Sequence, residues 1–264
     1  MNDVSLDVVD LRAFYASPLG HVARRFVGDV ALRFWPDVKG LRVAGIGFAV
    51  PYLALLREGA ERTLALMPAT QGVVNWPSSG LSASALVEPT TLPLPDASID
   101  RIMVIHALEE SESPEELLEE VWRVLGPGGR LLAVVPSRRG LWARMDTTPF
   151  GHGRPYSRSQ LETLMRRTML SPENWSEALY VPPLPRRFLM QSAALWEKAG
   201  RSLSLPLAGV HVVDATKQFY RKAPLRATRR AFAFRPLLLP APATTTRTKH
   251  WQQGGDDESG AGFS

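Results

Sequence analysis

Cysteine is absent from the sequence, and its absence excludes several kinds of chemistry at once. A chain of 264 residues without cysteine has no disulfide, no thiolate metal site, no iron–sulfur cluster and no cysteine nucleophile. The chain also lacks an apolar run near the roughly 18 to 20 residues that a membrane-spanning helix needs. Its start, MNDVSLDVVD, carries acids where a secretion signal carries basic residues. We therefore expect a cytoplasmic protein without a transmembrane segment.

Histidine is also scarce, and its five copies are scattered along the chain, so we expect no metal centre. The remaining composition is that of an ordinary soluble globular protein, with 45% hydrophobic and 22% charged residues. Lys and Arg number 31 against 26 Asp and Glu, which gives a formal charge of +5. This modest excess suits an acidic partner without requiring one.

The composition changes at about residue 221. Residues 221–264 combine scattered basic residues with several prolines, a threonine run and a Gly/Ser-rich end, and no helical or strand period is present. Such a segment cannot bury enough apolar surface to offset the cost of ordering it. We predict a basic, disordered tail. Contact of this tail with nucleic acid or an anionic membrane is the less favoured alternative, because its basic residues are not clustered.

Between residues 41 and 220, short apolar runs alternate with amphipathic stretches. This alternation is typical of an α/β domain, in which helices cover the faces of a parallel sheet. Six runs are predicted as strands, at 41–47, 62–67, 84–87, 101–105, 130–135 and 209–213.

Three helices are predicted from their starts. Ser17 and Pro18 open one whose apolar residues recur at spacings of three and four, so residues 1–40 are predicted to form a helical cover on the sheet. A serine followed three residues later by Glu or Gln predicts two further starts, at Ser113 with Glu116 and at Ser157 with Gln160.

The stretch from Ala85 to Pro136 carries five short motifs in a fixed order: Glu88, Leu92-Pro93, Pro95-Asp96 with Asp100, His106-Ala-Leu-Glu, and Leu125-Gly-Pro-Gly-Gly. In these motifs the chain resembles the class I S-adenosylmethionine-dependent methyltransferases, in particular the small-molecule branch often called type 11. The resemblance extends more weakly over residues 41–220. It implies a doubly wound, seven-stranded, mostly parallel sheet of the Rossmann-like kind.

The resemblance also implies methyl transfer from S-adenosylmethionine to a small or anionic acceptor. An acid beyond a strand's carboxyl end, such as Glu88, lies where open α/β sheets bind ligands and could accept from the adenine amine. Leu92 would offer the ring a wall and backbone groups, and His106 lies at the mouth of the fourth strand. The positions that would contact the cofactor are Gly45, Gly47, Ala49, Met67, Glu88, Leu92 and His106.

The first half of this pattern departs from the family. Gly45 stands where the family has an acid, and Met67-Pro68 stands where an acid binds the ribose diol. A hydrogen bond to a charged group contributes roughly 1.5 to 3 kcal/mol, so the loss could weaken binding on the order of a hundredfold. Gln71, Glu58 or Glu61 could replace the acid. A catalytically degenerate scaffold or regulatory protein that acts through partners therefore remains an alternative.

A dinucleotide-binding dehydrogenase is the other fold-level alternative. Gly45-Ile-Gly47 matches the start of its glycine-rich loop, but Val50 stands where the third glycine belongs, and no acid follows at the ribose position. A lone G-x-G is a weak signal, so this alternative is disfavoured.

Residues 137–156 follow the fifth strand and are predicted to form a lid over the substrate crevice. Its candidate residues for binding an anionic acceptor are Arg138, Arg139, His152, Arg154 and Tyr156. His152 and Tyr156, with His106, are also the candidates for catalysis. A solvated basic loop is the competing interpretation. Residues 185–201 predict an amphipathic helix whose apolar stripe, which includes Leu195 and Trp196, would face the core or a second copy of the chain.

Overall fold

The computed structural model describes residues 6–184, 192–202 and 207–219. The predicted tail, residues 221–264, lies outside the described residues, as do residues 185–191 of the predicted helix at 185–201. None of the described helices is both long and apolar enough to cross a membrane.

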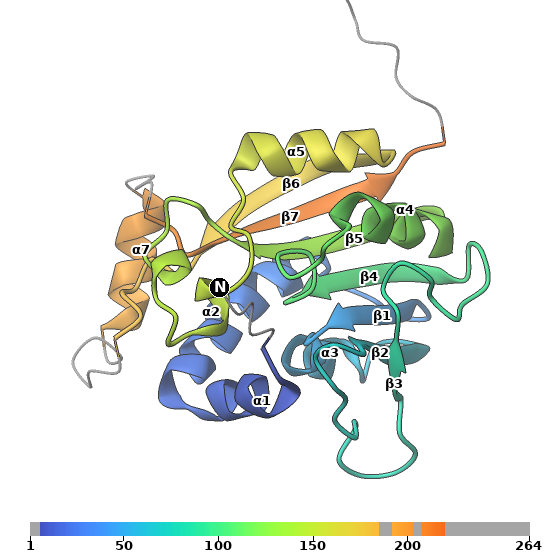
Figure 1. Ribbon diagram of the computed structural model, residues 1–264, viewed down its shortest axis with the longest axis horizontal. Helices are drawn as coiled ribbons and strands as arrows, with labels where there is room; N and C mark the ends of the chain where they lie inside the picture. Colours follow the sequence, from blue (N-terminus) through green and yellow to red (C-terminus); the bar gives the residue numbers. More distant parts are fainter. Residues whose placement is uncertain (1–5, 185–191, 203–206, 220–264) are drawn as a thin grey trace, which may run out of the picture. The chain divides into compact units, whose positions relative to one another are not determined.

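A seven-stranded sheet forms the centre of the described part, in the order β3-β2-β1-β4-β5-β7-β6 (Figure 1). Neighbouring strands are parallel except for β7, which runs antiparallel to both β5 and β6. The strands are β1 (Arg42–Gly47), β2 (Arg62–Pro68), β3 (Ser84–Val87), β4 (Ile99–Ile105), β5 (Leu125–Pro136), β6 (Leu170–Ala178) and β7 (Val210–Lys217). The predicted α/β, mostly parallel sheet is confirmed, and each of the six predicted runs overlaps one of these strands.

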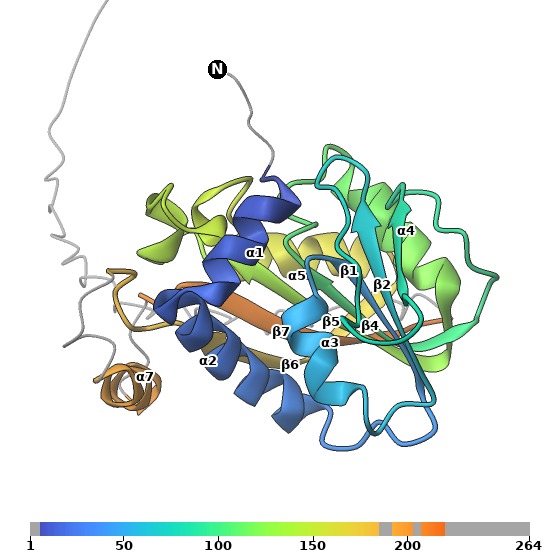
Figure 2. The same ribbon diagram turned by 90° about the horizontal axis from the view of Figure 1, so that it is seen from below.

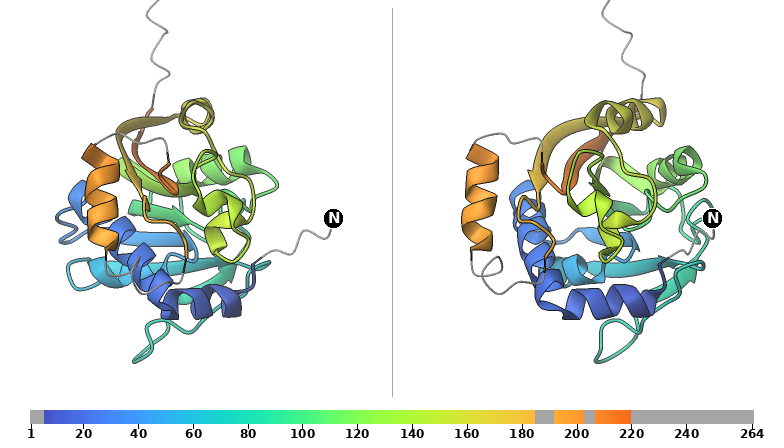
Figure 3. Two further views of the ribbon diagram at one scale, coloured as in Figure 1. Left: turned by 90° about the vertical axis from the view of Figure 1, so that its left-hand side faces the viewer. Right: turned by 60° about the vertical axis from the view of Figure 1, so that its left-hand side comes forward.

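Helices cover both faces of the sheet. Figures 2 and 3 show α1 (Val8–Ala16), α2 (Pro18–Phe34) and α3 (Val50–Leu56) on one side, with α4 (Pro114–Val124) and α5 (Arg158–Arg167) on the other. Successive strand residues point to opposite faces, so Val43 packs in the core under α1–α3, and Ala44 packs in the core under α4 and α5. Two apolar layers thus hold the sheet between its helices.

The helix starts follow the predicted capping chemistry at two places and not at a third. The Ser17 hydroxyl accepts the Gly20 N–H at 3.1 Å ahead of Pro18, and Ser157 with Gln160 forms a complete capping box. α4 begins at Pro114 as expected, but Ser113 makes no side-chain capping bond. The capping box predicted there is wrong, because Ser113 has φ −120° and ψ 70°, away from the extended conformation usual at that position.

The helix α7 (Ala193–Ser202) presents a different face to the core from the one predicted. Leu195 is 70% exposed and Trp196 is 41% exposed, so the predicted stripe does not lie in the core. Glu197 is buried instead, and its carboxylate accepts the backbone N–H groups of Leu179 and Tyr180. These charge-assisted bonds fix the orientation of α7, since a carboxylate is buried only with such partners.

Candidate functional site

The carboxyl ends of β1 and β4 meet closely, at the point where the strand order reverses. Gly47 ends β1 with φ +82°, and a Cβ built on it would collide with the Ile105 carbonyl oxygen and lie 2.9 Å from the Ala107 Cβ. Only glycine permits this approach between the two strand ends. Open α/β sheets bind ligands at such a switch point, so this edge is the candidate site.

His106 follows β4 at this edge and is 1% exposed. Its Nε2 lies 2.9 Å from the Tyr15 hydroxyl, and its Nδ1 lies 3.3 Å from Oε1 of Glu109, which is also 1% exposed. The Tyr15 hydroxyl also lies 3.0 Å from that of Tyr52. In the tautomer protonated at Nδ1, Nε2 accepts a hydrogen bond from Tyr15, and the Nδ1 proton lies on the side of Glu109 without forming a hydrogen bond of good geometry. The four side chains therefore form a continuous buried polar chain.

Two phenylalanine rings, Phe48 and Phe150, cover this chain. The Tyr15 ring stacks on Phe48 at a centroid distance of 5.6 Å and an angle of 26°, and the Phe150 ring lies 4.7 Å from the His106 ring. The six residues Tyr15, Phe48, Tyr52, His106, Glu109 and Phe150 are called the His106 cluster, and none is more than 7% exposed.

Burial controls the ionisation of the cluster's tyrosines. Burial, then Tyr52, then the charge of Glu109 raise the pKa of Tyr15 well above its ordinary value, and burial also raises the pKa of Tyr52. Both hydroxyls are therefore protonated at neutral pH and available as hydrogen-bond donors.

A cavity of about 390 Å³ lies between the ends of β2, β3 and β4. Glu88 lines it and is exposed, with one carboxylate oxygen accepting the Thr90 hydroxyl at 3.2 Å. A carboxylate has further lone pairs for an exocyclic amine. Glu88 thus offers the acceptor that the resemblance predicts for adenine, whereas Leu92, the predicted wall, is not among the residues that line this cavity.

Protein side chains fill the positions that the resemblance predicts for the ribose and the methionine of the cofactor. Gln71 is 4% exposed and its side-chain amide donates to the His106 carbonyl, so it is not turned toward a ribose. Met67 is 1% exposed, and its sulfur accepts the Val74 N–H at 3.4 Å. Phe48 and Ala49 are also buried. In this conformation these residues do not fit the ribose and methionine half of the cofactor.

The missing acid at position 45 has a packing explanation. A Cβ on Gly45 would lie 2.5 Å from the Ala49 Cβ and 2.8 Å from a Leu53 methyl carbon. Gly45 therefore lets α3 pack directly on β1, and a carboxylate side chain has no room there.

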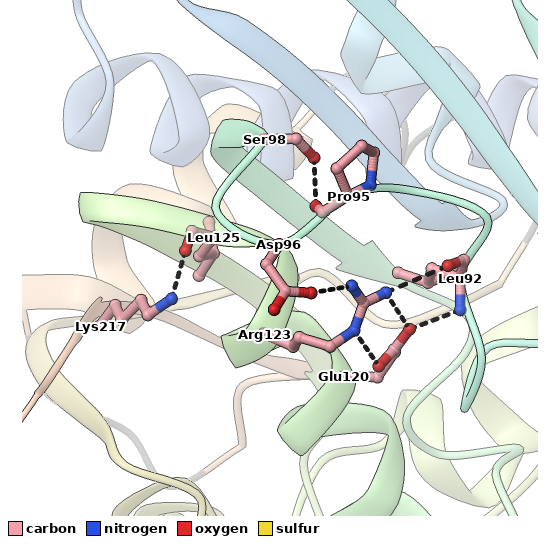
Figure 4. A network of polar contacts seen from close by, with 8 residues as sticks. All are labelled: Leu92, Pro95, Asp96, Ser98, Glu120, Arg123, Leu125 and Lys217. Carbon is pink, nitrogen blue, oxygen red and sulfur yellow. Dashed lines mark hydrogen bonds and ion pairs between the residues drawn. The ribbon is translucent and has the colours of Figure 1, made fainter.

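The loop that follows β3 is held by one arginine (Figure 4). Arg123 on α4 donates to both carboxylate oxygens of Glu120, at 2.8 and 2.6 Å, and to the Leu92 carbonyl at 3.1 Å. The Leu92 N–H donates to Glu120 at 2.6 Å, and Arg123 also contacts Asp96. The Arg123 guanidinium lowers the pKa of the Glu120 carboxyl. Both backbone groups of Leu92 are thus occupied within the protein, so the predicted backbone contact with adenine is not available here.

The five lid candidates separate into two groups. Arg138, Arg139 and Tyr156 line a second cavity of about 530 Å³ at the start of α5. His152 Nε2 contacts the Asp146 carbonyl at 2.8 Å, and neither His152 nor Arg154 lines that cavity. Arg154 contacts the site through its backbone rather than its guanidinium, because its N–H donates to the Glu109 carbonyl at 2.8 Å.

The hydroxyl of Tyr156 donates to the Leu108 carbonyl at 3.3 Å, beside the His106 cluster. Burial, and secondly the charge of Glu109, raise the pKa of Tyr156 to about 12. Tyr156 is therefore protonated at neutral pH and is not a base in this conformation. Among the described residues, no group of three or more His, Asp or Glu could hold a metal ion.

Sequence reasoning missed Tyr15 as the partner of His106, and Tyr52 as the partner of Tyr15. Each lies on the buried side of a short helix, where its phenol ring fits an apolar stripe. No local signal marks the hydroxyl of either residue, because its partner is distant in the sequence.

Comparisons with known proteins agree with this architecture. Residues 44–133 match the sequence model of a family described as "Methyltransferase domain". The chain is 27% identical over 190 residues to a demethylmenaquinone methyltransferase of Thermus thermophilus, covering 71% of this chain and 78% of the relative. It is 26% identical over 212 residues to the enzyme of that name from Deinococcus radiodurans, covering 77% and 80%.

A solved structure from Thermotoga maritima, titled as a SAM-dependent methyltransferase and possible histamine N-methyltransferase, has the same fold. It matches with a TM-score of 0.53 and 18% identity, and the match covers 80% of this chain and 96% of that chain.

Proposed function

Because the chain belongs to the class I S-adenosylmethionine-dependent methyltransferases, we propose that it transfers a methyl group from S-adenosylmethionine to a small aromatic acceptor. The observation that carries the proposal is the Glu88 cavity at the switch point of the sheet. Gln71 and Ala107 line it beside the His106 cluster, so the proposed cofactor pocket would adjoin the proposed reaction site. The names of the two relatives favour a quinone-like acceptor over an anionic one.

S-adenosylmethionine supplies a reactive methyl group when bound, and the protein's own residues would position it. Glu88, which lines the cavity, would accept from the adenine amine. Occupation of the methionine half requires Phe48 and Gln71 to move from the positions described above. Such chemistry depends mainly on alignment and exclusion of water, and the aromatic cover of the His106 cluster is suited to both.

A second candidate function has a specific observation in its favour. The filled methionine half, together with the missing acids at Gly45 and Met67, suits a methyltransferase-like scaffold that no longer binds the cofactor. The Arg138, Arg139 and Tyr156 cavity would then be a candidate surface for a partner or an anion. Assignment of the five lid residues to acceptor binding remains a prediction.

Methyl transfer can be measured with radiolabelled S-adenosylmethionine and a panel of hydroxylated aromatic compounds, including quinols. We expect protein-dependent label in one or more of them. Glu88→Ala should lower the rate at subsaturating cofactor about tenfold, because it removes a charged hydrogen-bond acceptor. The effect is no larger because Glu88 is exposed and its charge is partly screened by water. Glu119→Ala on α4 removes an exposed carboxylate that lines neither this cavity nor the one at Arg138, and it should leave the rate unchanged. Absence of label from every acceptor would favour the scaffold.

A further inference from the structure

The strongest unexplained feature of the fold is the buried carboxylate of Glu109, at one end of the polar chain in the His106 cluster. Glu109 is 1% exposed, and among the described residues its Oε2 accepts no hydrogen bond, while Oε1 has only the 3.3 Å contact with His106 Nδ1. Tyr15 from α1 and Tyr52 from α3 are the other ionisable side chains in this chain of contacts, and the charge of Glu109 also acts on nearby Tyr156. An apolar cluster would be at least as stable, so packing alone does not account for the buried acid.

The backbone at His106 is also unusual. Its φ is +54°, in the left-handed region that side-chain-bearing residues seldom adopt, and the Gln71 side chain donates to its carbonyl. Strained backbone of this kind persists where the surrounding structure holds it, and it is concentrated at functional sites. The strained backbone places the imidazole of His106 at the strand end, between Tyr15 and Glu109.

Tyr15 approaches His106 as a ligand would. Its phenol ring stacks on the Phe48 ring, and its hydroxyl lies 2.9 Å from His106 Nε2. The Phe150 ring also packs against the His106 ring, with the two centroids 4.7 Å apart. Tyr15 belongs to α1, which lies outside the sheet, so its side chain can leave without breaking a sheet hydrogen bond.

We propose that Tyr15 occupies the place of the acceptor, and that the acceptor is a hydroxylated aromatic compound whose O–H replaces that of Tyr15 at His106 Nε2. This inference rests on the proposed function and adds the acceptor's chemical class and its catalytic base. The aromatic ring takes the place of the Tyr15 ring beside the His106 imidazole. The acceptor's O–H bond breaks, and its proton forms an N–H bond at Nε2. The products are a phenolate and an imidazolium paired with Glu109, so no other reactant is needed.

The test uses 4-nitrophenol, whose phenolate absorbs visible light and whose neutral form does not. Tyr15→Ala vacates the proposed place, and we expect it to bind the probe at least tenfold more tightly than the wild type, with the phenolate band enhanced at a pH below the probe's own pKa. Tyr15→Phe keeps the ring in place and should bind as poorly as the wild type. Tyr15→Leu serves as a second, milder variant if Tyr15→Ala does not fold.

A matched pair of double variants decides the role of His106. Tyr15→Ala/His106→Asn should bind the probe without the phenolate band, since asparagine tolerates a positive φ but is not a base. Tyr15→Ala/His211→Gln alters another buried histidine, which pairs with Glu177 at 3.4 Å, and should retain the band. Binding of the neutral probe alone, or an equal band in the His106 variant, overturns the proposal, since any cavity left by Tyr15 can admit a phenol.

This measurement needs no S-adenosylmethionine, so its failure is distinguishable from failure of methyl transfer. A phenolate band that depends on His106 supports the acceptor site even if no label is transferred. Label transfer to a hydroxylated compound without that band overturns the site while leaving the proposed function intact.

Discussion

Replacement of Arg123 by alanine tests how the loop beside the Glu88 cavity is held. The substitution removes two hydrogen bonds to Glu120 and one to the Leu92 carbonyl. The Glu120 side chain is 11% exposed and that of Arg123 is 32% exposed, so these charge-assisted bonds are partly screened. The contact with Asp96, which is 78% exposed, contributes little. We expect a loss of about 2 kcal/mol in the free energy of unfolding.

For a chain of this size, a loss of that magnitude lowers the melting temperature by roughly 4 to 8 °C. Thermal unfolding followed by circular dichroism measures it directly. The control is Arg166→Ala, which removes an exposed pair with Glu162 one turn away on α5 and should change stability by less than about 0.5 kcal/mol. Equal shifts for the two variants would refute the argument that the Arg123 contacts hold the loop more strongly than an ordinary surface pair.

Three further predictions concern the sheet and its buried polar groups. Gly47→Ala should lower the free energy of unfolding by about 2 to 5 kcal/mol in urea unfolding, because the new methyl group clashes with the Ile105 carbonyl oxygen at a positive φ. Gly128→Ala, also at a positive φ (+70°) but with open space around it, should cost only about 1 kcal/mol. Asp214→Ala should cost about 3 to 5 kcal/mol by the same measurement, because this buried carboxylate pairs with Arg130 and also accepts hydrogen bonds from Trp35 and Asn174. The free energy of unfolding should fall as the pH rises above about 10, because the buried tyrosines have raised pKa values and stabilise the fold only while they are protonated. Tyr52→Phe removes one of these tyrosines, so its free energy of unfolding should fall less steeply with pH.

The strand that the sequence pattern missed shows what periodicity can and cannot detect. The parallel strands are short apolar runs, and all of them were predicted. β6 contains Pro172, Glu173 and Asn174, and its pairing with β7 shifts register between Pro172 and Asn174. It is an edge strand held by hydrogen bonds to β7 rather than by two apolar faces, so no hydrophobic signal marks it.

The candidate site was predictable only in part, for a similar reason. The ends of β1 and β4 follow from strand order, which places Gly47 and His106 at the same edge. The contact between Tyr15 and His106 joins residues 91 positions apart, and nothing local distinguishes that tyrosine from the apolar residues of α1. Likewise, whether the site has room for the cofactor depends on the rotamer of Gln71, which only tertiary packing determines.

Calorimetric titration of the wild-type protein with S-adenosylhomocysteine tests the central claim most directly. S-adenosylhomocysteine is the product of methyl transfer, and it carries the adenine, ribose and amino-acid groups that the site beside Glu88 must bind. Because the ribose acid is missing and Phe48 and Gln71 must be displaced, we predict saturable binding of one molecule per chain, with a dissociation constant well above micromolar. Absence of binding at millimolar concentration would contradict assignment of this edge as a cofactor site.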